Sequence, residues 1–214
     1  MAKDREGPKH LLPIGGKPVI EHTLGSLPAQ ITEVVFVVGG PYEADIRDYF
    51  AKRSRDRHAF AFVVQREQLG VAHAFRCARD IVHGRFLGLV GDDIFSEKGL
   101  SALLEHDLSL LASRVKDPSR FGVLVPDKKG NLLRAFEKPQ EFISDLVWNG
   151  AMVMDESFFE AETAPSARGE HEAVDAWMRL MGEGGKNIKI VESDMWLPIN
   201  DKEELERAEG SFRC

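Results

Sequence analysis

Lys9 and the pair Asp92-Asp93 are the residues best suited to handling a phosphate and a metal ion. Lys9 begins an apolar segment that ends in a Gly-Gly turn at 15–16, and the two aspartates directly follow the apolar run 86–91. A lysine ammonium is a compact charge for a phosphate, and carboxylate oxygens are ligands for Mg²⁺. The alternative for Lys9 is an ordinary solvated lysine. The alternative for the two aspartates is a solvated turn or a cap on the following helix.

Gln65 and Gly70 have the chemistry to recognise a base. Gln65 ends the apolar run 59–64, and its carboxamide offers a donor and an acceptor to a base edge. Gly70 follows at a predicted strand-to-helix turn, where a missing side chain lets a ligand approach the backbone. An ordinary polar loop containing a glycine explains the same residues when they are considered alone.

Two short segments in the second half of the chain suit a sugar phosphate. Glu137 and Lys138 place a carboxylate beside an ammonium, which could hold a sugar hydroxyl and a phosphate. Asn149 and Gly150 could place an amide and bare backbone beside the same ligand. The alternatives are an exposed ion pair, which contributes little stability, and a strand with a bulge at Gly150.

Asn200 has two competing interpretations. It precedes an acidic segment in which Glu203 stands at the capping-box position, so Asn200 is a good helix N-cap. Its side-chain oxygen could instead bind a metal ion. His10, His73 and His171 show no metal-ligand spacing and are assigned no role.

The apolar pattern predicts the elements that position these residues. Runs that are apolar on both sides indicate buried parallel strands, and they alternate with segments of helical spacing. The predicted strands lie at 31–40, 59–64, 86–90, 146–154 and 188–191, and the predicted helices at 42–50, 71–82, 100–111, 174–181 and 201–209. Residues 121–125 and 132–136 predict a hairpin, and residues 163–169 a loop.

This alternation predicts an α/β fold with a Rossmann-like, mostly parallel sheet flanked by helices, and ligands at the carboxyl ends of its strands. The length of 214 residues suits a single domain. We expect a nucleotide-binding half over 1–115 and a hairpin-containing, sugar-binding half over 116–214.

Charge and composition limit the kinds of partner and the location that we expect for this chain. The formal net charge is −7 and no dense Lys/Arg run is present, which argues against nucleic acid as a partner. No apolar run reaches membrane-spanning length, and the N-terminus shows no apolar signal segment. The two cysteines, Cys77 and Cys214, make no disulfide framework. We therefore expect a cytoplasmic protein.

The order of the motifs resembles that of the sugar-1-phosphate nucleotidyltransferases, from residue 8 to about residue 209. The resemblance lies in Pro8-Lys9, Leu11–Ile14, Gly16–Pro18, Gln65, Leu69–Ala74, Gly91-Asp92, Phe121–Val123, Glu137–Pro139, Trp148–Gly150 and Trp196–Leu205. It implies Mg²⁺-dependent transfer between an NTP and a sugar 1-phosphate, which yields a nucleotide-sugar and pyrophosphate.

The same resemblance implies a role for each motif residue. Lys9 would bind the nucleotide phosphates, and Asp92 and Asn200 would hold Mg²⁺. Gln65 and Gly70 would bind the base. The sugar would be held by Gly122, Glu137, Asn149 and Gly150, with Lys138 on its phosphate.

The chain departs from the family pattern at three places, one of which is that the segment 148–151 does not fix its own register against the family's Asn-x-Gly. Family members open with a strand and a glycine-rich loop, Leu-Ala-Ala-Gly-x-Gly-Thr-Arg, and only residues 1–7 precede Pro8 here. Many members carry a metal-binding aspartate where Pro198 stands, whereas the N-acetylglucosamine-1-phosphate uridylyltransferase-like branch uses an asparagine two places on, at Asn200. These last two departures keep open an alternative, a non-catalytic binding module that retains the sugar pocket. A missing central strand would also leave apolar groups that favour self-association.

Overall fold

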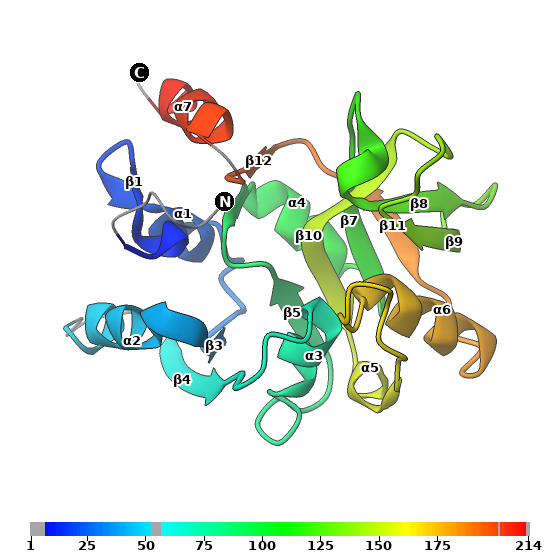
Figure 1. The fold of residues 1–214 in the computed structure, drawn as a ribbon, viewed down its shortest axis with the longest axis horizontal. Helices are drawn as coiled ribbons and strands as arrows, with labels where there is room; N and C mark the ends of the chain where they lie inside the picture. Colours follow the sequence, from blue (N-terminus) through cyan, green and yellow to red (C-terminus); the bar gives the residue numbers. More distant parts are fainter. Residues whose placement is uncertain (1–6, 53–56, 201, 213–214) are drawn as a thin grey trace.

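A six-stranded sheet forms the centre of the fold (Figure 1). The computed structural model describes residues 7–52, 57–200 and 202–212. The strands are β5 (Phe86–Leu89), β7 (Ser109–Arg114), β8 (Gly122–Pro126), β9 (Leu132–Glu137), β10 (Leu146–Met154) and β11 (Lys189–Glu192). β10 is antiparallel to β5, β7 and β8, and β11 is parallel to β7, so β5, β7, β8 and β11 run in one direction. The predicted hairpin is confirmed as β8–β9.

Helices cover both faces of this sheet, because the buried side chains of its strands alternate between two cores. On β10, Met152 and Met154 face a core built with α3 (Val71–Arg76), α5 (Ser157–Glu160) and α6 (Ala173–Gly182). Ala151 and Val153 face the opposite core, with α1 (Val19–Gly25), α2 (Glu43–Ala51) and α4 (Glu97–Leu104). This arrangement confirms the predicted α/β class.

The helix predicted over 100–111 is wrong in its second half. α4 begins after Ser96, whose hydroxyl accepts from the Gly99 N–H at 2.9 Å, and it ends at Leu104. Leu110 and Leu111 beyond it belong to β7, since Leu110 packs in one core and Leu111 in the other, and Leu108 lies just before this strand. In a strand, successive side chains point to opposite faces, so a strand that is buried on both faces can carry as many leucines as the apolar face of a helix. The helix predicted over 71–82 likewise ends early, at Arg76.

β3 (Glu33–Val38) and β4 (Ala59–Val64) form a separate parallel pair, joined by the short helix η2 (Gly40–Tyr42) and α2. Phe36 stacks on Phe50 and Phe62 within this unit. Leu87 and Leu89 of β5 belong to the same core as the apolar side chains of β3. Within the described residues, β3 pairs with β4 and β5 pairs with β10.

The two ends of the described chain meet beside the sheet. β1 (Pro13–Ile14) packs on α7 (Lys202–Ser211), while η1 (Lys9–Leu11) and β2 (Lys17–Pro18) contact α1. β6 (Asp93–Phe95) pairs with β12 (Trp196–Pro198). Their small core is formed by Ile14, Val19, Ile94, Ile199 and Ala208. The remaining short helix, η3 (Pro118–Arg120), precedes β8. None of the described helices is both long and apolar enough to cross a membrane.

Candidate active site

Lys9, Asp92 and Asn200 converge on one point although they come from three distant segments. Lys9 Nζ lies 2.6 Å from Asp92 Oδ2 and 3.4 Å from Asn200 Oδ1. Asp92 follows β5 and Asn200 follows β12, so the antiparallel pairing of β6 with β12 brings their segments together. A carboxylate oxygen and an amide oxygen therefore face the same cation. Oxygen donors of this kind fit a hard divalent ion such as Mg²⁺.

Asn200 directs its side-chain oxygen into this cluster. Its backbone N–H donates to Glu204 Oε2 at 2.6 Å, so the carboxylate that caps this turn comes from Glu204 instead of Glu203, the expected capping-box residue. Asn200 Oδ1 accepts from Lys9 Nζ. This geometry favours the ligand interpretation of Asn200 over the simple N-cap.

Asp93 anchors the β12 segment, whereas the sequence offered it only as part of a candidate metal-binding pair with Asp92. Its buried carboxylate accepts from Trp196 Nε1 at 2.9 Å and from the Ile199 backbone N–H at 3.4 Å. Burial, with a smaller effect from the charge of Asp92, raises the pKa of Asp93 to about 7, and the bond from Trp196 opposes this shift. Since Ile199 directly precedes Asn200, Asp93 fixes the segment that carries the Asn200 oxygen.

Gln65 and Gly70 lie together at the end of β4. Gln65 Nε2 donates to the Gly70 carbonyl at 3.2 Å and lies 3.0 Å from His73 Nδ1. Gly70 has a φ of +92°, and a Cβ there would stand 2.8 Å from the His171 carbonyl oxygen. Position 70 therefore requires glycine because the backbone at 170–171 packs against it. The sequence had suggested the close approach of a ligand instead.

Glu137, Lys138 and Gly122 form a second group on the hairpin. Gly122 stands opposite Glu137 in the β8–β9 ladder, and a Cβ at Gly122 would lie 3.3 Å from Glu137 Oε2. Lys138 has a φ of +45°, the one positive value among the described non-glycine residues, and such backbone strain is concentrated at functional sites. Its Nζ lies 3.4 Å from Glu137 Oε1.

Arg168 is a residue of this group that the sequence analysis missed. Its Nη2 lies 3.2 Å from Glu137 Oε1 and 2.7 Å from Oε1 of the buried Glu172. Burial raises the pKa of Glu137 and the charge of Glu172 adds to the shift, while Lys138 and Arg168 oppose it. The only sequence signal was an arginine in a glycine- and glutamate-containing loop, which alone indicates a solvated charge.

Asn149 and Gly150 lie inside the bulge of β10. Asn149 is buried, and its Nδ2 donates to Ser113 Oγ at 3.1 Å, while its Oδ1 has no partner among the described residues. Gly150 has a φ of +98°, and a Cβ there would stand 2.2 Å from Val90 Cγ2. The bulge therefore lets β10 pass close to the segment that leads to Asp92.

The predicted site residues thus form separate groups that are linked through the backbone. The segment 166–172 joins two of them, since His171 packs on Gly70 and Arg168 pairs with Glu137. The bulge at Gly150 brings β10 close to the segment that carries Asp92, because a Cβ at Gly150 would lie 3.4 Å from Oδ2 of the adjacent Asp93. Within residues 7–52, 57–200 and 202–212, no polar contact joins Asp92 directly to Lys138.

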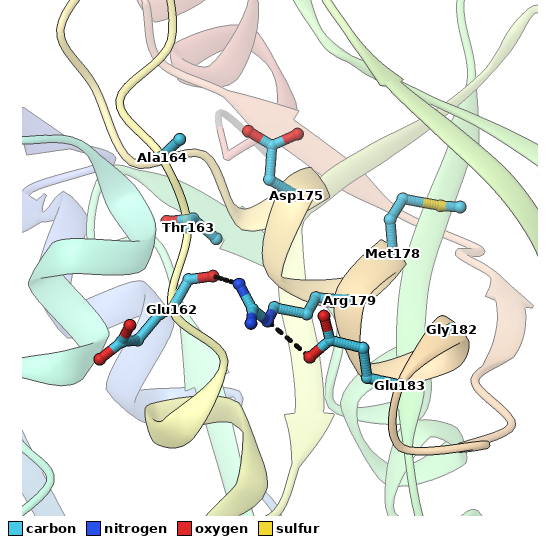
Figure 2. A pocket seen from close by; sticks show the side chains of 8 residues that line it. All are labelled: Glu162, Thr163, Ala164, Asp175, Met178, Arg179, Gly182 and Glu183. Carbon is cyan, nitrogen blue, oxygen red and sulfur yellow. Dashed lines mark hydrogen bonds and ion pairs between the residues drawn. The ribbon is translucent and has the colours of Figure 1, made fainter.

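A surface pocket lies outside these groups, between the 162–164 segment and α6 (Figure 2). Arg179 reaches across it and donates to the Glu162 carbonyl at 2.7 Å and to Glu183 Oε2 at 2.8 Å. Its charge is already paired within the pocket, and no predicted site residue lines it. The pocket is not part of the candidate site.

The α/β domain thus carries the cluster of Lys9, Asp92 and Asn200, with one polar group at Gln65 and Gly70 and another at Glu137 and Lys138. A family model described as nucleotidyl transferase matches residues 4–210. The chain belongs to the sugar-1-phosphate nucleotidyltransferase family, as the sequence resemblance predicts.

Individual relatives agree with this assignment. The chain is 32% identical to the bifunctional protein GlmU of Methanococcus maripaludis over 209 residues, 96% of this chain and 49% of that protein. It is 30% identical to a UTP–glucose-1-phosphate uridylyltransferase, AglF, of Haloferax volcanii, over 94% of this chain and 86% of that one. The chain spans about half the length of the first of these relatives.

A solved structure supports the fold directly. A glucose-1-phosphate thymidylyltransferase from Bacillus anthracis, crystallised with sucrose, superposes with a TM-score of 0.84 at 28% identity. The match covers 97% of this chain and 87% of that one.

Proposed function

We propose that this chain catalyses the Mg²⁺-dependent reaction of an NTP with a sugar 1-phosphate, which gives a nucleotide-sugar and pyrophosphate. The observation that carries the proposal is the convergence of Lys9, Asp92 and Asn200 within 3.4 Å of one ammonium nitrogen. Two oxygen ligands and a phosphate-binding cation in one place suit a reaction in which a phosphate oxygen attacks an α-phosphorus and displaces pyrophosphate. A cytoplasmic location and self-association remain proposals of the same kind.

In this proposal Asp92 and Asn200 would hold the metal ion through their side-chain oxygens. When bound, Mg²⁺ would supply positive charge that neutralises the triphosphate. Lys9 binds the nucleotide phosphates as a point charge on a flexible stem. Its side chain and that of Asp92 are 22% and 31% exposed, so both can reach a substrate. Asp93 orients Asn200 through Ile199 and Trp196.

The flanking groups position the two substrates. Gln65 and the backbone at Gly70 bind the base. Glu137, Asn149, Gly122 and Gly150 hold the sugar, with Lys138 and Arg168 supplying positive charge for its phosphate. The sugar-phosphate oxygen then attacks the α-phosphorus in line, and the pyrophosphate leaves. Rate enhancement comes from positioning and charge stabilisation, because the protein forms no covalent bond to the substrate.

A pyrophosphate-release assay tests the proposal. Each of the common NTPs is paired with a panel of sugar 1-phosphates, with Mg²⁺ and with chelator, and wild type is compared with Asp92→Asn. We expect release that needs both substrates and Mg²⁺ and that falls at least about 100-fold in the variant. Sugar-phosphate binding without Mg²⁺-dependent NTP binding would instead indicate a binding module. No release from any pair would refute the proposed activity.

A further inference from the structure

The Lys9 ammonium occupies the oxygens that a metal ion needs. Its Nζ lies 2.6 Å from Asp92 Oδ2 and 3.4 Å from Asn200 Oδ1. Mg²⁺ binds oxygen at about 2.0–2.1 Å in a near-octahedral shell. An ammonium that hydrogen-bonds the same carboxylate oxygen takes up the lone pair that points toward the ion. A divalent ion placed there would also lie a few ångströms from a positive charge and would be repelled by it.

Lys9 is held in this position by its own local structure. It begins η1, where the Leu11 N–H donates to the Pro8 carbonyl at 2.9 Å and the Leu12 N–H donates to the Lys9 carbonyl at 3.1 Å. Pro8 is buried, so the backbone at this turn is anchored while the Lys9 stem stays part-exposed. Among the described ion pairs, Lys9 is the one cation paired with Asp92.

We propose that Lys9 competes with the metal ion for Asp92 and Asn200, and that an incoming triphosphate relieves the competition by drawing the ammonium onto its phosphates. Metal alone then binds weakly, and metal and nucleotide bind cooperatively. The inference rests on the proposed function for the identity of the ligands, but it concerns binding only. It can therefore fail or succeed independently of turnover.

Mn²⁺ titration followed by electron paramagnetic resonance tests the competition without nucleotide. The proteins are wild type, Lys9→Met, Lys9→Arg and the double variant Lys9→Met/Asp92→Asn. Methionine keeps much of the stem and removes the charge, whereas arginine keeps the charge. We expect Lys9→Met to bind Mn²⁺ about fivefold more tightly than wild type, the scale of a partly exposed charge interaction. Lys9→Arg should stay near wild type, and the double variant should lose the gain.

Equal or weaker Mn²⁺ binding in Lys9→Met overturns the proposal, as does a gain that survives the removal of Asp92. If Lys9→Met binds more tightly and the pyrophosphate assay stays silent, the competition holds and the proposed activity fails. If pyrophosphate is released but Lys9→Met binds Mn²⁺ no better, the activity holds and the competition fails.

A second measurement uses only the wild-type protein, so it does not depend on how the variants fold. The rate of amine acetylation at Lys9 is followed by mass spectrometry, with and without Mg²⁺. Displacement from Asp92 frees the Lys9 amine, so we expect Mg²⁺ to raise the labelling rate at Lys9. The rate at Lys129, in the turn between β8 and β9, should be unchanged. An unchanged or slower rate at Lys9 contradicts the competition.

Discussion

The indole of Trp196 donates to the buried carboxylate of Asp93 across a separation of 103 residues, with Nε1 2.9 Å from Oδ2. The same carboxylate accepts from the backbone of Ile199, so one side chain ties β6 to the segment that ends at Asn200. The contacts of Asp93 therefore fix the backbone next to Asn200, and Asp93 is itself the neighbour of Asp92, the other candidate metal ligand.

Trp196→Phe should destabilise the protein by about 1.5–3 kcal/mol, because a buried carboxylate loses a hydrogen-bond donor. Trp148→Phe is the matched control, since Trp148 Nε1 donates to the neutral Ala151 carbonyl at 2.8 Å and should cost about 0.5–1.5 kcal/mol beyond the shared loss of ring packing. Urea unfolding measures both. A cost at Trp196 no larger than that at Trp148 contradicts this account of Asp93.

Gly150→Ala should destabilise the protein by at least about 2 kcal/mol. The substitution adds a Cβ at a φ of +98° and 2.2 Å from Val90 Cγ2, so backbone strain and overpacking act together. Gly25→Ala at the end of α1 is the control, because a Cβ there meets nothing within 4 Å. We expect it to be neutral or slightly stabilising. Equal thermal unfolding of the two variants would show that the bulge tolerates a side chain.

Arg168→Met should weaken sugar 1-phosphate binding about tenfold or more, since charge-assisted hydrogen bonds to a phosphate contribute about 1.5–3 kcal/mol. Calorimetry with glucose 1-phosphate measures the effect, and NTP affinity should stay unchanged. Arg179→Met removes a similarly paired arginine from the pocket in Figure 2, outside the candidate site. Comparable losses in both variants, or none in Arg168→Met, would remove Arg168 from the sugar-phosphate group.

Glu137→Gln should change how stability depends on pH. The pKa of Glu137 is raised in the folded protein, chiefly by burial, so the unfolded state ionises more readily in the pH range that begins at the ordinary glutamate pKa and ends at the raised one. Raising the pH therefore lowers the unfolding free energy of wild type, and this loss is absent in the glutamine variant. The stability of the variant relative to wild type should rise with pH across this window.

The control for that prediction is Glu192→Gln on β11. Glu192 is exposed and pairs with Arg114 at 3.0 Å, so the substitution removes the same charge without the burial. Urea unfolding at several pH values compares the three proteins. If Glu137→Gln shows no rise relative to wild type, or if Glu192→Gln shows the same rise, burial of Glu137 is not the cause.

Local apolar patterns were enough to predict the α/β class and most strands. The run at 34–38 and the hairpin around Gly130 are specified by residues close in sequence. Leu108 and Leu111 misled the helix prediction, because leucines spaced by three fit both a helix and a strand that is buried on two faces. Only the two cores on either side of β7 distinguish these interpretations.

The contacts within the candidate site depend on topology and could not be read from local sequence. The pairing of Lys9 with Asp92 spans 83 residues, and the role of Asp93 depends on β6 meeting β12. Arg168 lies in a loop whose composition predicts only exposure, and its importance follows from the return of that loop to Glu137. The family motifs were enough to identify the candidate site residues, whereas the contacts that these residues make could be seen only in the folded structure.

The central claim is that both halves of the chain bring two phosphorylated substrates to one metal ion. Its most direct test is ³¹P relaxation in a complex of the protein with Mn²⁺, the α,β-methylene analogue of UTP and glucose 1-phosphate. The account predicts strong Mn²⁺-induced relaxation of the nucleotide α-phosphorus and of the sugar phosphate, both lost in Asp92→Asn. Relaxation confined to the nucleotide, with the sugar phosphate bound but unaffected, would contradict it.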